Sequence, residues 1–333
     1  MLNTDAKLSE KVFAEDIEQA PTRDGFGTGT IEAGKADSNV VVLCADLAES
    51  TRAEWFQNEF PDRFIEMGVA EQNMAAVAAG MALADKVPFI ASYAAFNPGR
   101  NYEQIRTTIA LNSVPVKICG MHAGVSVGPD GATHQMLEDI GMMRMLPGMT
   151  VIVPADAEEA RKAVVAAAKH DGPVYLRFGR AAVPTFTTAD TPFQIGKALV
   201  LFDSFGNAEA LKVAILSTGS LSYTALVAAK ALSEEGIESV VLHVPTVKPL
   251  DETAVLEAAK RAGRVVTIEE HQAMGGFGSA IAELLSDHQP VPVKRLGVID
   301  QFGQSGTPDE LLAHYGLDVA HVQDAVRAFV REA

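Results

Sequence analysis

The stretch RFIEMGVAEQNMAAVAAGMALADKVPFIASY, residues 63–93, decides the fold of this chain. The apolar runs at 63–67 and 87–93 have the length of buried strands, and the residues between them, 71–85, form an apolar helical segment. This segment is so rich in Ala, Val and Met that we expect it to be buried on all sides. Continuous apolar strands separated by a helix predict a parallel sheet covered by helices on both faces.

The same alternation extends in both directions from this stretch. We expect further strands at 40–44, 114–119, 149–154 and 173–178, and helices at 100–112, 135–145 and 156–169. A second alternating unit has predicted strands at 212–217, 238–244, 264–269 and 292–297, and helices near 220–235, 251–262, 276–286 and 318–331. These patterns predict an α/β protein with two open α/β domains, the first of them with a mostly parallel sheet.

The segments outside these units indicate the domain boundaries. Residues 183–196 are rich in Pro and Thr and lack a helical period, so we interpret them as a linker. We therefore expect one domain at 21–182 and a second at 197–333. Residues 1–20 are polar and weakly periodic, and we expect them to form an N-terminal arm that lies on a partner.

The composition excludes several classes of protein. The 333 residues are 48% hydrophobic, enough for a sizeable core, and their formal net charge of −16 with no basic stripe argues against nucleic-acid binding. The start of the chain does not resemble a signal peptide, and the longest apolar stretch, 74–84, is too short to span a bilayer. The two cysteines, Cys44 and Cys119, provide neither a disulfide framework nor a Cys-based zinc site. We expect a cytoplasmic protein without membrane contact.

Glu71 is the first candidate for chemistry, because it opens a helix directly after a strand. A carboxylate in the first turn of a helix ordinarily complements the helix dipole. However, open α/β sheets bind ligands in the loops after their strands, and a carboxylate there can donate or accept a proton. Tyr93 and Phe96 follow the next strand. Such aromatic residues usually belong to a core, but Pro98 and Gly99 place Phe96 in a loop, where its ring can face a ligand.

The segment GMHAGVSVGPDGATHQMLED, residues 120–139, is the richest in candidates, with His122, Asp130 and His134. Its glycines allow a ligand to approach the backbone closely, and we expect the next helix to begin near Gln135. The spacing is not that of a zinc motif, and a surface loop with incidental histidines is an alternative. The two histidines and the aspartate also suit hydrogen bonding to a polyhydroxylated substrate, or proton transfer near pH 7.

Other segments could bind an anion. Four arginines lie near the ends of predicted elements, although any one of them could be a solvated surface residue: Arg23, Arg100, Arg177 and Arg180. In the second unit, the glycine pair of EEHQAMGGFGSAIAELL, residues 269–285, precedes a helix. It could bind an anion or allow close packing, and we favour packing.

Taken together, these segments resemble the C-terminal half of a transketolase, from about Thr22 to the end of the chain. The motifs GVAEQNMAAVAAGMAL and GPDGATHQ are specific to thiamine-diphosphate enzymes. PTRDGFG, ADLAES, YAAF, QIR, YLRFGR, STGS and GGFGSA lie at the expected places around them. The chain most resembles the separately encoded C-terminal subunit of a split transketolase, which implies a pyrimidine-binding domain followed by a transketolase C-terminal domain.

The resemblance implies a set of residues that bind the cofactor. Glu71 resembles the glutamate that hydrogen-bonds N1′ of the aminopyrimidine of thiamine diphosphate, a contact that promotes the reactive tautomer. Phe96 matches the ring that stacks on the pyrimidine, and Tyr93 stands where a phenylalanine lining the same pocket is common. Asp46 in ADLAES matches an aspartate near the cofactor.

The resemblance also implies residues that bind the substrate. Those matching contacts to the sugar hydroxyls and the intermediate are His122, Asp130 and His134, and those matching the phosphate site are Arg23, Ser50 and Arg180. Of all these residues, we expect Glu71, His122 and His134 to be catalytic. The loop before Arg100 is one residue longer than in full-length transketolases, so the resemblance assigns no role to Arg100.

One family element is missing from this chain. Transketolases bind the diphosphate and its metal through a Gly-Asp-Gly segment and a later Asn in a separate N-terminal domain, and this chain has no Gly-Asp-Gly. The resemblance therefore implies half an active site and no metal ligand in this chain. Thiamine diphosphate and Mg²⁺ are expected to be bound mainly by an N-terminal subunit, in a two-fold assembly of two of these chains with two partners.

We therefore expect the reversible transfer of a two-carbon ketol group from a ketose phosphate, of the xylulose 5-phosphate type, to an aldose phosphate. The beta subunit of a 2-oxoacid dehydrogenase E1 component is an alternative, since it shares the two-domain layout. A deoxyxylulose-phosphate synthase shares AEQ and THQ but is usually one long chain. A non-enzymatic alternative is a regulatory or partner-binding subunit that has kept the fold, although Glu71 and the THQ histidine are both present.

Overall fold

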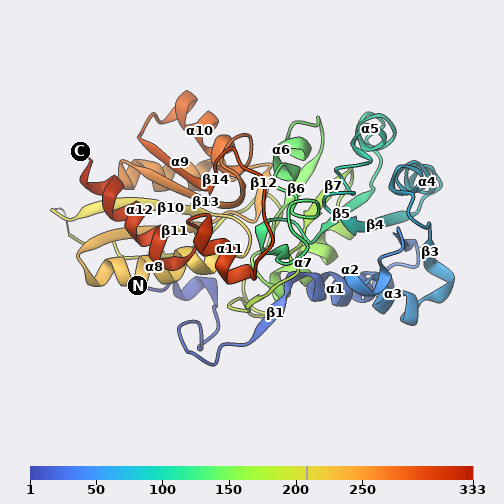
Figure 1. Ribbon diagram of the computed structural model, residues 1–333, viewed down its shortest axis with the longest axis horizontal. Helices are drawn as coiled ribbons and strands as arrows, with labels where there is room; N and C mark the ends of the chain where they lie inside the picture. The colour runs from blue at the N-terminus through green and yellow to red at the C-terminus, as the bar shows by residue number, and fades with distance from the viewer. Residues whose placement is uncertain (208, 333) are drawn as a thin grey trace.

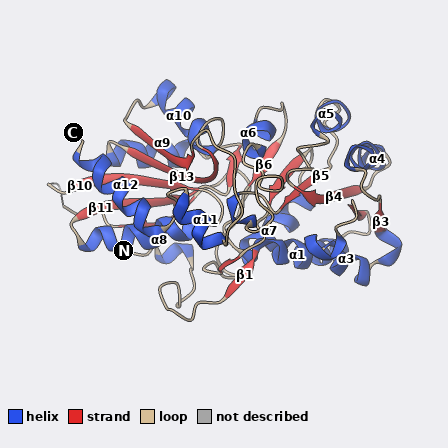
Figure 2. Cartoon of the chain, viewed as in Figure 1, coloured by secondary structure: helices blue, strands red, loops and turns tan. Residues whose placement is uncertain are grey.

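The computed structural model describes residues 1–207 and 209–332. Within these residues the strands form a seven-stranded sheet, a five-stranded sheet and a two-stranded ribbon. The two larger sheets follow one another along the long axis of the molecule, and both termini lie on the side of the five-stranded sheet (Figure 1). Helices cover both sheets, as Figure 2 shows, so the predicted α/β class with two open α/β units is confirmed.

The seven-stranded sheet is parallel except at one edge. Its order across the described residues is β12-β6-β7-β5-β4-β2-β3. The bounds are β2 Val40–Cys44, β3 Phe64–Glu66, β4 Val87–Tyr93, β5 Lys117–Met121, β6 Thr150–Ile152, β7 Val174–Arg177 and β12 Thr246–Lys248. The antiparallel edge strand β12 comes from the second half of the chain and pairs with β6. The second unit therefore completes the sheet of the first, which the apolar runs do not predict.

Alternate side chains of the strands supply the two faces of this sheet. Val40 and Val42 pack on one side with Phe26 and Phe56, whereas Leu43 packs on the other side with Met74. The helical segments of the first side are α1 Thr22–Ala36, α2 Ala48–Thr51, α3 Ala53–Glu59 and α7 Ala157–Ala168, with a short 3-10 turn, η2 Pro61–Arg63, after α3. Those of the second side are α4 Glu71–Leu83, α5 Tyr102–Gln104, a π-helix η3 Ile105–Ala110 and α6 Asp139–Arg144.

The five-stranded sheet has the described order β14-β13-β10-β11-β9 and is parallel except for β9. Its strands are β9 Leu199–Asp203, β10 Leu211–Ser217, β11 Ile237–His243, β13 Val265–Gln272 and β14 Val293–Val298. The helices that pack on it are α8 Leu221–Glu234 and α12 Val319–Arg331 on one face, and α9 Glu252–Ala262 and α10 Phe277–His288 on the other. The helix α11 Pro308–His314 reaches across to the turn η4 Val125–Val127 of the first unit.

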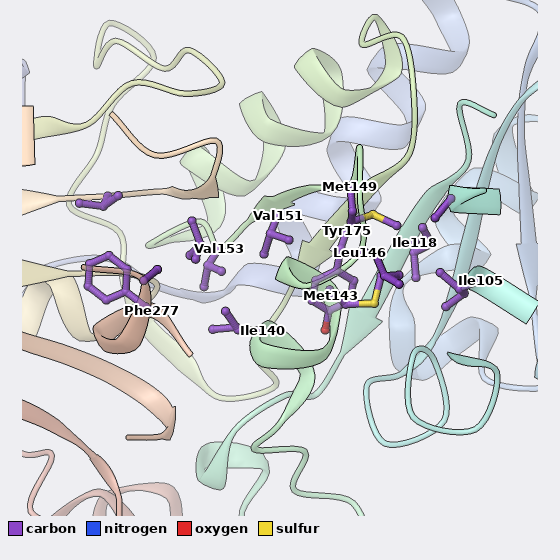
Figure 3. Close-up of a cluster of buried hydrophobic side chains, with 14 of the residues drawn as sticks. Ile105, Ile118, Ile140, Met143, Leu146, Met149, Val151, Val153, Tyr175 and Phe277 are labelled. Carbon is purple, nitrogen blue, oxygen red and sulfur yellow. The ribbon is translucent and has the colours of Figure 1, made fainter. Parts of the chain in front are cut away.

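One apolar cluster runs through both units. It joins α4 and η3 on the first sheet to α9 and α10 on the second. Figure 3 shows part of it, with Phe277 of α10 at one end, Val151 and Val153 between, and Ile105 and Ile118 at the other end. The two sheets are thus held in a fixed relation by a shared core. No helix of the described residues is long and apolar enough to cross a bilayer.

Two predicted helices differ from those in the structure. The expectation that 71–85 is buried on all sides is wrong, because only one face of α4 packs on the sheet and Val77 and Leu83 are exposed. The helix expected near Gln135 begins instead at Asp139 as α6. The Gln135 side chain holds an irregular loop, since its Nε2 donates to the carbonyl oxygens of Val125 and Gly128.

The N-terminal arm lies on its own chain. The turn η1 Thr4–Ala6 and the buried Val12 pack near the second sheet, and β1 Gln19–Pro21 pairs with β8 Ala182–Pro184. The arm therefore covers the second unit, where we expected it to lie on a partner. The stretch 183–196 is also fixed in place, since the amides of Phe186 and Thr187 donate to the buried Asp156.

Candidate active site

The candidate residues gather at the carboxyl edge of the seven-stranded sheet. Asp46 follows β2, Glu71 begins α4 after β3, Tyr93 ends β4, and His122 follows β5. Because the strands are parallel and adjacent, their ends bring these side chains to one side of the sheet. Asp46 and His122 have positive φ angles of 56° and 53°, which are uncommon for residues with a Cβ and occur mostly where function or packing demands them.

Glu71 is one of the buried residues of the site. Its side chain is 1% exposed, and its carboxylate accepts a hydrogen bond from Ser92 Oγ at 3.1 Å and one from Arg100 Nη1 at 2.7 Å. The guanidinium carbon of Arg100 lies 4.5 Å from the centre of the Phe96 ring. A flat cation with N–H groups therefore lies over Phe96 and donates to Glu71. Glu71 could thus accept a hydrogen bond from an N–H at the edge of a flat ring such as an aminopyrimidine, while Phe96 stacks on the face of that ring.

Arg100, one of the four arginines that could bind an anion, is paired with Glu71 in the structure, and the longer loop explains its position. Asn97 is buried, and its amide donates to the carbonyl oxygens of Ile90 and Cys119, within β4 and β5, each at 3.1 Å. This contact anchors the loop, which then carries Arg100 back to Glu71. The extra residue was the only signal in the sequence, and it pointed to the loop without indicating the ion pair.

Aromatic rings connect Glu71's neighbourhood to the 120–139 segment. The rings of Tyr93 and Phe96 are 6.1 Å apart and nearly parallel, and Tyr93 lies 4.1 Å from the ring of His122. His134 stands edge-on to Phe96 at 5.5 Å, and its Nδ1 lies 2.9 Å from Thr133 Oγ1. Tyr93 also bonds Ser50, with their hydroxyl oxygens 2.6 Å apart. Five of the predicted residues therefore form one continuous cluster.

His122 is neutral in this cluster. Arg23 Nη1 lies 3.1 Å from His122 Nε2, and because a guanidinium only donates, Nε2 must accept and the ring proton must sit on Nδ1. Burial, together with the charges of Arg23 and Arg180, lowers the pKa of His122 to about 3. Within the described residues, Nδ1 is buried and has no hydrogen-bond partner. His122 therefore carries a buried N–H donor that no group in the described part of the chain accepts from.

Arginines gather beside His122. Arg23 Nη1 donates to the Ser50 carbonyl oxygen at 2.7 Å, and Arg180 Nη1 donates to the Val127 carbonyl oxygen at 2.9 Å. Burial, and after it the charge of Arg52, lowers the pKa of Arg23. A hollow of about 410 Å³ is lined by Arg23, Asp46, Leu47, Ala48, Glu49, Ser50 and Arg52. Like charges that repel one another beside a hollow are suited to a bound anion.

Three candidates lie apart from this cluster. Asp130 is exposed on its loop and has no hydrogen bond to the cluster in the described part of the chain. Arg177 is not available to an anion, since it is buried against Asp139, with Nε 2.7 Å from Oδ2. The glycine pair before α10 does not leave an open anion site either, because the amides of Phe277 and Gly278 donate to Glu269. Among residues 1–207 and 209–332, no group of three or more His, Cys, Asp or Glu side chains is arranged to hold a metal ion.

Comparisons with known proteins show the family of both units. Residues 18–185 match the family model described as transketolase, pyrimidine binding domain, and residues 207–322 match transketolase, C-terminal domain. A putative transketolase C-terminal section of Methanocaldococcus jannaschii is 42% identical over 89% of this chain and 92% of its own length. A 6-deoxy-6-sulfo-D-fructose transketolase subunit of Clostridium sp. is 39% identical over 93% of this chain and 94% of its own.

A solved structure is also similar to this chain. It is described as a split gene transketolase, inactive beta4 tetramer, and is 43% identical to the chain, with a TM-score of 0.85. The alignment covers 93% of this chain and 98% of the other. The similarity thus extends over both units.

Proposed function

The chain belongs to the transketolase family, and from this premise we propose that it is the C-terminal subunit of a split transketolase. In this proposal it works with a separate N-terminal subunit and moves a two-carbon ketol group from a ketose phosphate of the xylulose 5-phosphate type to an aldose phosphate. The observation that carries the proposal is the buried Glu71 carboxylate facing Phe96, beside the neutral His122 and its cationic neighbour Arg23.

Thiamine diphosphate, when bound, supplies a nucleophilic carbon that holds the two-carbon unit between donor and acceptor. Glu71 would hold the pyrimidine through a hydrogen bond, and burial would keep water from competing for that carboxylate. Phe96 would support the flat face of the same ring, as it now supports the guanidinium of Arg100. For Glu71 to accept that bond, Arg100 has to leave Oε2, and its 44% exposed side chain can swing into solvent.

The substrate would lie on the His122 side of the cluster. His122 would donate from Nδ1 to a sugar oxygen, as a fixed neutral donor and not as a group that gains and loses a proton. His134, half-buried against Phe96, is the candidate for proton transfer to and from the substrate. Arg23 and Ser50, which line the hollow, and Arg180 would hold the terminal phosphate. Asp46, which also lines the hollow, would lie near the cofactor, and the exposed Asp130 would contact a sugar hydroxyl.

The proposed partner follows from what this chain presents and what it lacks. One face of α4 is exposed and carries the apolar side chains of Val77 and Leu83. Val69, just before α4, and Leu111, just after η3, are exposed as well. Exposed apolar surface next to a half-built site favours burial in an assembly. We propose that this face meets the N-terminal subunit and a second copy of this chain. The diphosphate and its Mg²⁺ would then be held mainly by that subunit.

The donor is the least constrained part of the proposal, since the Clostridium relative is named for a sulfonated sugar. A cationic hollow suits a sulfonate as well as a phosphate. The test is ketol transfer by this chain mixed with the N-terminal subunit, thiamine diphosphate and Mg²⁺, with ribose 5-phosphate as acceptor. We expect faster transfer from xylulose 5-phosphate than from 6-deoxy-6-sulfofructose. The reverse order would assign the sulfonated donor, and failure with both would count against a transketolase of this class.

A further inference from the structure

The second unit contributes none of the predicted catalytic residues, yet it contacts the loop that carries them. The amide of Ser126 donates to Glu270 Oε1 at 2.6 Å, and Gln135 Nε2 donates to the carbonyl oxygen of Gln304 at 2.9 Å. Ser126 lies between His122 and Val127, whose carbonyl oxygen receives Arg180. The contact from Glu270 therefore reaches the part of the loop that sets both His122 and Arg180.

Glu270 is built into this contact. Its side chain is 7% exposed at the end region of β13, and burial raises its pKa. Its own carbonyl oxygen accepts from Arg177 Nη2 at 2.9 Å, which ties it to the first sheet. Gly124 has a φ angle of 88°, and a Cβ at that position would lie 2.3 Å from Glu270 Oε1. The Glu270 carboxylate therefore lies against the loop at a glycine, where a larger residue would clash with it.

The Ser126 amide needs this acceptor. It belongs to the short turn η4, where Ser126 is buried and its amide donates to Glu270 Oε1. A buried N–H without an acceptor is unfavourable, so loss of the Glu270 carboxylate would make the loop move until its amide reached water. Such a movement would shift His122, whose Nε2 must stay within reach of Arg23 to keep its proton on Nδ1.

We propose that Glu270 is a positioning residue for the reaction, through which the second unit fixes the 122–136 loop and the direction of the His122 donor. This inference rests on the proposed function and extends it. Glu270 does not touch the proposed substrate. It acts through the Ser126 amide.

Glu269 provides a matched control. It is the neighbouring residue on β13, it is also a buried carboxylate, and burial also raises its pKa. Its oxygens accept from the amides of Phe277 and Gly278 at 2.7 and 2.8 Å, at the start of α10. In the described contacts it has no hydrogen bond to the 122–136 loop. The two carboxylates therefore differ in the backbone that donates to them: the turn at Ser126 for Glu270, and the start of α10 for Glu269.

The first test is amide hydrogen exchange on the full chain, which needs no activity. In Glu270→Met, exchange at Ser126 should rise about tenfold or more, while exchange at Phe277 and Gly278 stays unchanged. Glu269→Met should give the opposite pattern. If Glu270→Met fails to fold, Glu270→Asp keeps the buried charge and withdraws the carboxylate by one methylene, and should raise exchange at Ser126 alone. Unchanged exchange at Ser126 in the folded variant would overturn the proposal.

The second test uses the reconstituted enzyme. Glu270→Met should lower kcat/KM for the sugar phosphates about tenfold and leave the Kd for thiamine diphosphate within about twofold, because Glu71 and Phe96 are untouched. Glu270→Gln, which keeps an acceptor oxygen, should recover most of this loss. Equal losses in cofactor and substrate binding would contradict positioning. If the wild-type mixture is inactive, the proposed function fails, while the exchange experiment still decides the role of Glu270 in the loop.

Discussion

Two buried histidines, at the ends of strands in the two units, show how differently the same residue can be used. His243 ends β11, and both its ring nitrogens are occupied, by Ser222 Oγ at 2.7 Å and Glu159 Oε2 at 2.8 Å. His122 follows β5, and only its Nε2 has a partner in the described chain. The first arrangement has the residue types of a hydrolase triad, but both histidine nitrogens already have protein partners, so neither is left to contact a ligand. A partly unsatisfied polar group therefore indicates a functional site better than residue type does.

The largest effect is expected from the replacement of Glu71, because the chemistry proposed at the strand ends near His122 depends on this carboxylate. Glu71→Gln should reduce kcat of the reconstituted enzyme about 100-fold or more, because an amide cannot share a proton with the pyrimidine as a carboxylate does. Steady-state ketol transfer measures this effect, and circular dichroism should show an unchanged fold. Near-normal turnover would contradict the role of Glu71.

The next effect concerns the anion end of the same region. Arg180→Ala should lower kcat/KM for phosphorylated acceptors about tenfold or more, and that for their unphosphorylated counterparts far less. Arg63 is the control, because its Nη1 donates to the carbonyl oxygen of Asp37 before β2 at 3.1 Å and it does not line the hollow, so its replacement should not discriminate between the two acceptors. Equal losses for both acceptors in Arg180→Ala would mean that Arg180 does not bind the phosphate.

A smaller effect is expected from the replacement of Arg100, which forms an ion pair with Glu71. Arg100→Met removes the ion pair with Glu71 and the contact with Phe96, and should strengthen the binding of thiamine diphosphate about threefold. Isothermal titration of the reconstituted complex measures the Kd. The control is Arg106→Met on the neighbouring π-helix, which should leave this Kd unchanged. Weaker binding in Arg100→Met would show instead that Arg100 helps to hold the cofactor.

His243, whose ring nitrogens are both paired, should have no part in the chemistry. Ser222→Ala removes the hydroxyl beside His243 and should leave kcat unchanged, while the free energy of unfolding falls by about 1 kcal/mol from the lost buried hydrogen bond. Urea unfolding and ketol transfer measure the two quantities separately. A large loss of kcat without a change in stability would indicate a second reactive site.

His122, whose Nδ1 has no partner in the described chain, should not titrate over the physiological range. Because the pKa of His122 is about 3 in the folded chain, against an ordinary 6.5, its ring signals should not shift between about pH 5 and 8. The folded state binds fewer protons here than the unfolded one, so His122 should lower stability as the pH falls from 6.5 toward 3. Nuclear magnetic resonance of the ring protons, with His122→Asn for assignment, measures this directly. A midpoint near pH 6.5 would contradict the neutral-donor role.

Local pattern predicted much of the fold. The runs at 40–44 and 87–93 coincide with β2 and β4, because a central parallel strand is apolar along its whole length. The pattern did not predict β12 or the β1–β8 ribbon, whose short strands depend on partners far away in the sequence. It also missed α1, since its glycines look unsuited to a helix. A Cβ at Gly25 would lie 2.1 Å from the carbonyl oxygen of Ala157, so the close packing on α7 requires glycine there.

The candidate site was predictable as a set of residues but not as a set of contacts. The strand-end positions of Glu71, Tyr93 and His122 followed from the sheet, and the structure brings these three to one edge. The protonation state of His122 depends on Arg23, which is 99 positions away, and no sequence spacing encodes that distance. The hydrogen bond from Arg100 to Glu71 likewise depends on the path of the loop between Tyr93 and Arg100.

The central claim is that this chain carries one half of an active site, and reconstitution tests it most directly. Ketol transfer from xylulose 5-phosphate to ribose 5-phosphate would be measured with thiamine diphosphate and Mg²⁺ while the N-terminal subunit is titrated into a fixed amount of this chain. We expect no transfer by either chain alone and a rate that rises until the two are present in equal amounts. Full activity of this chain by itself would contradict the claim.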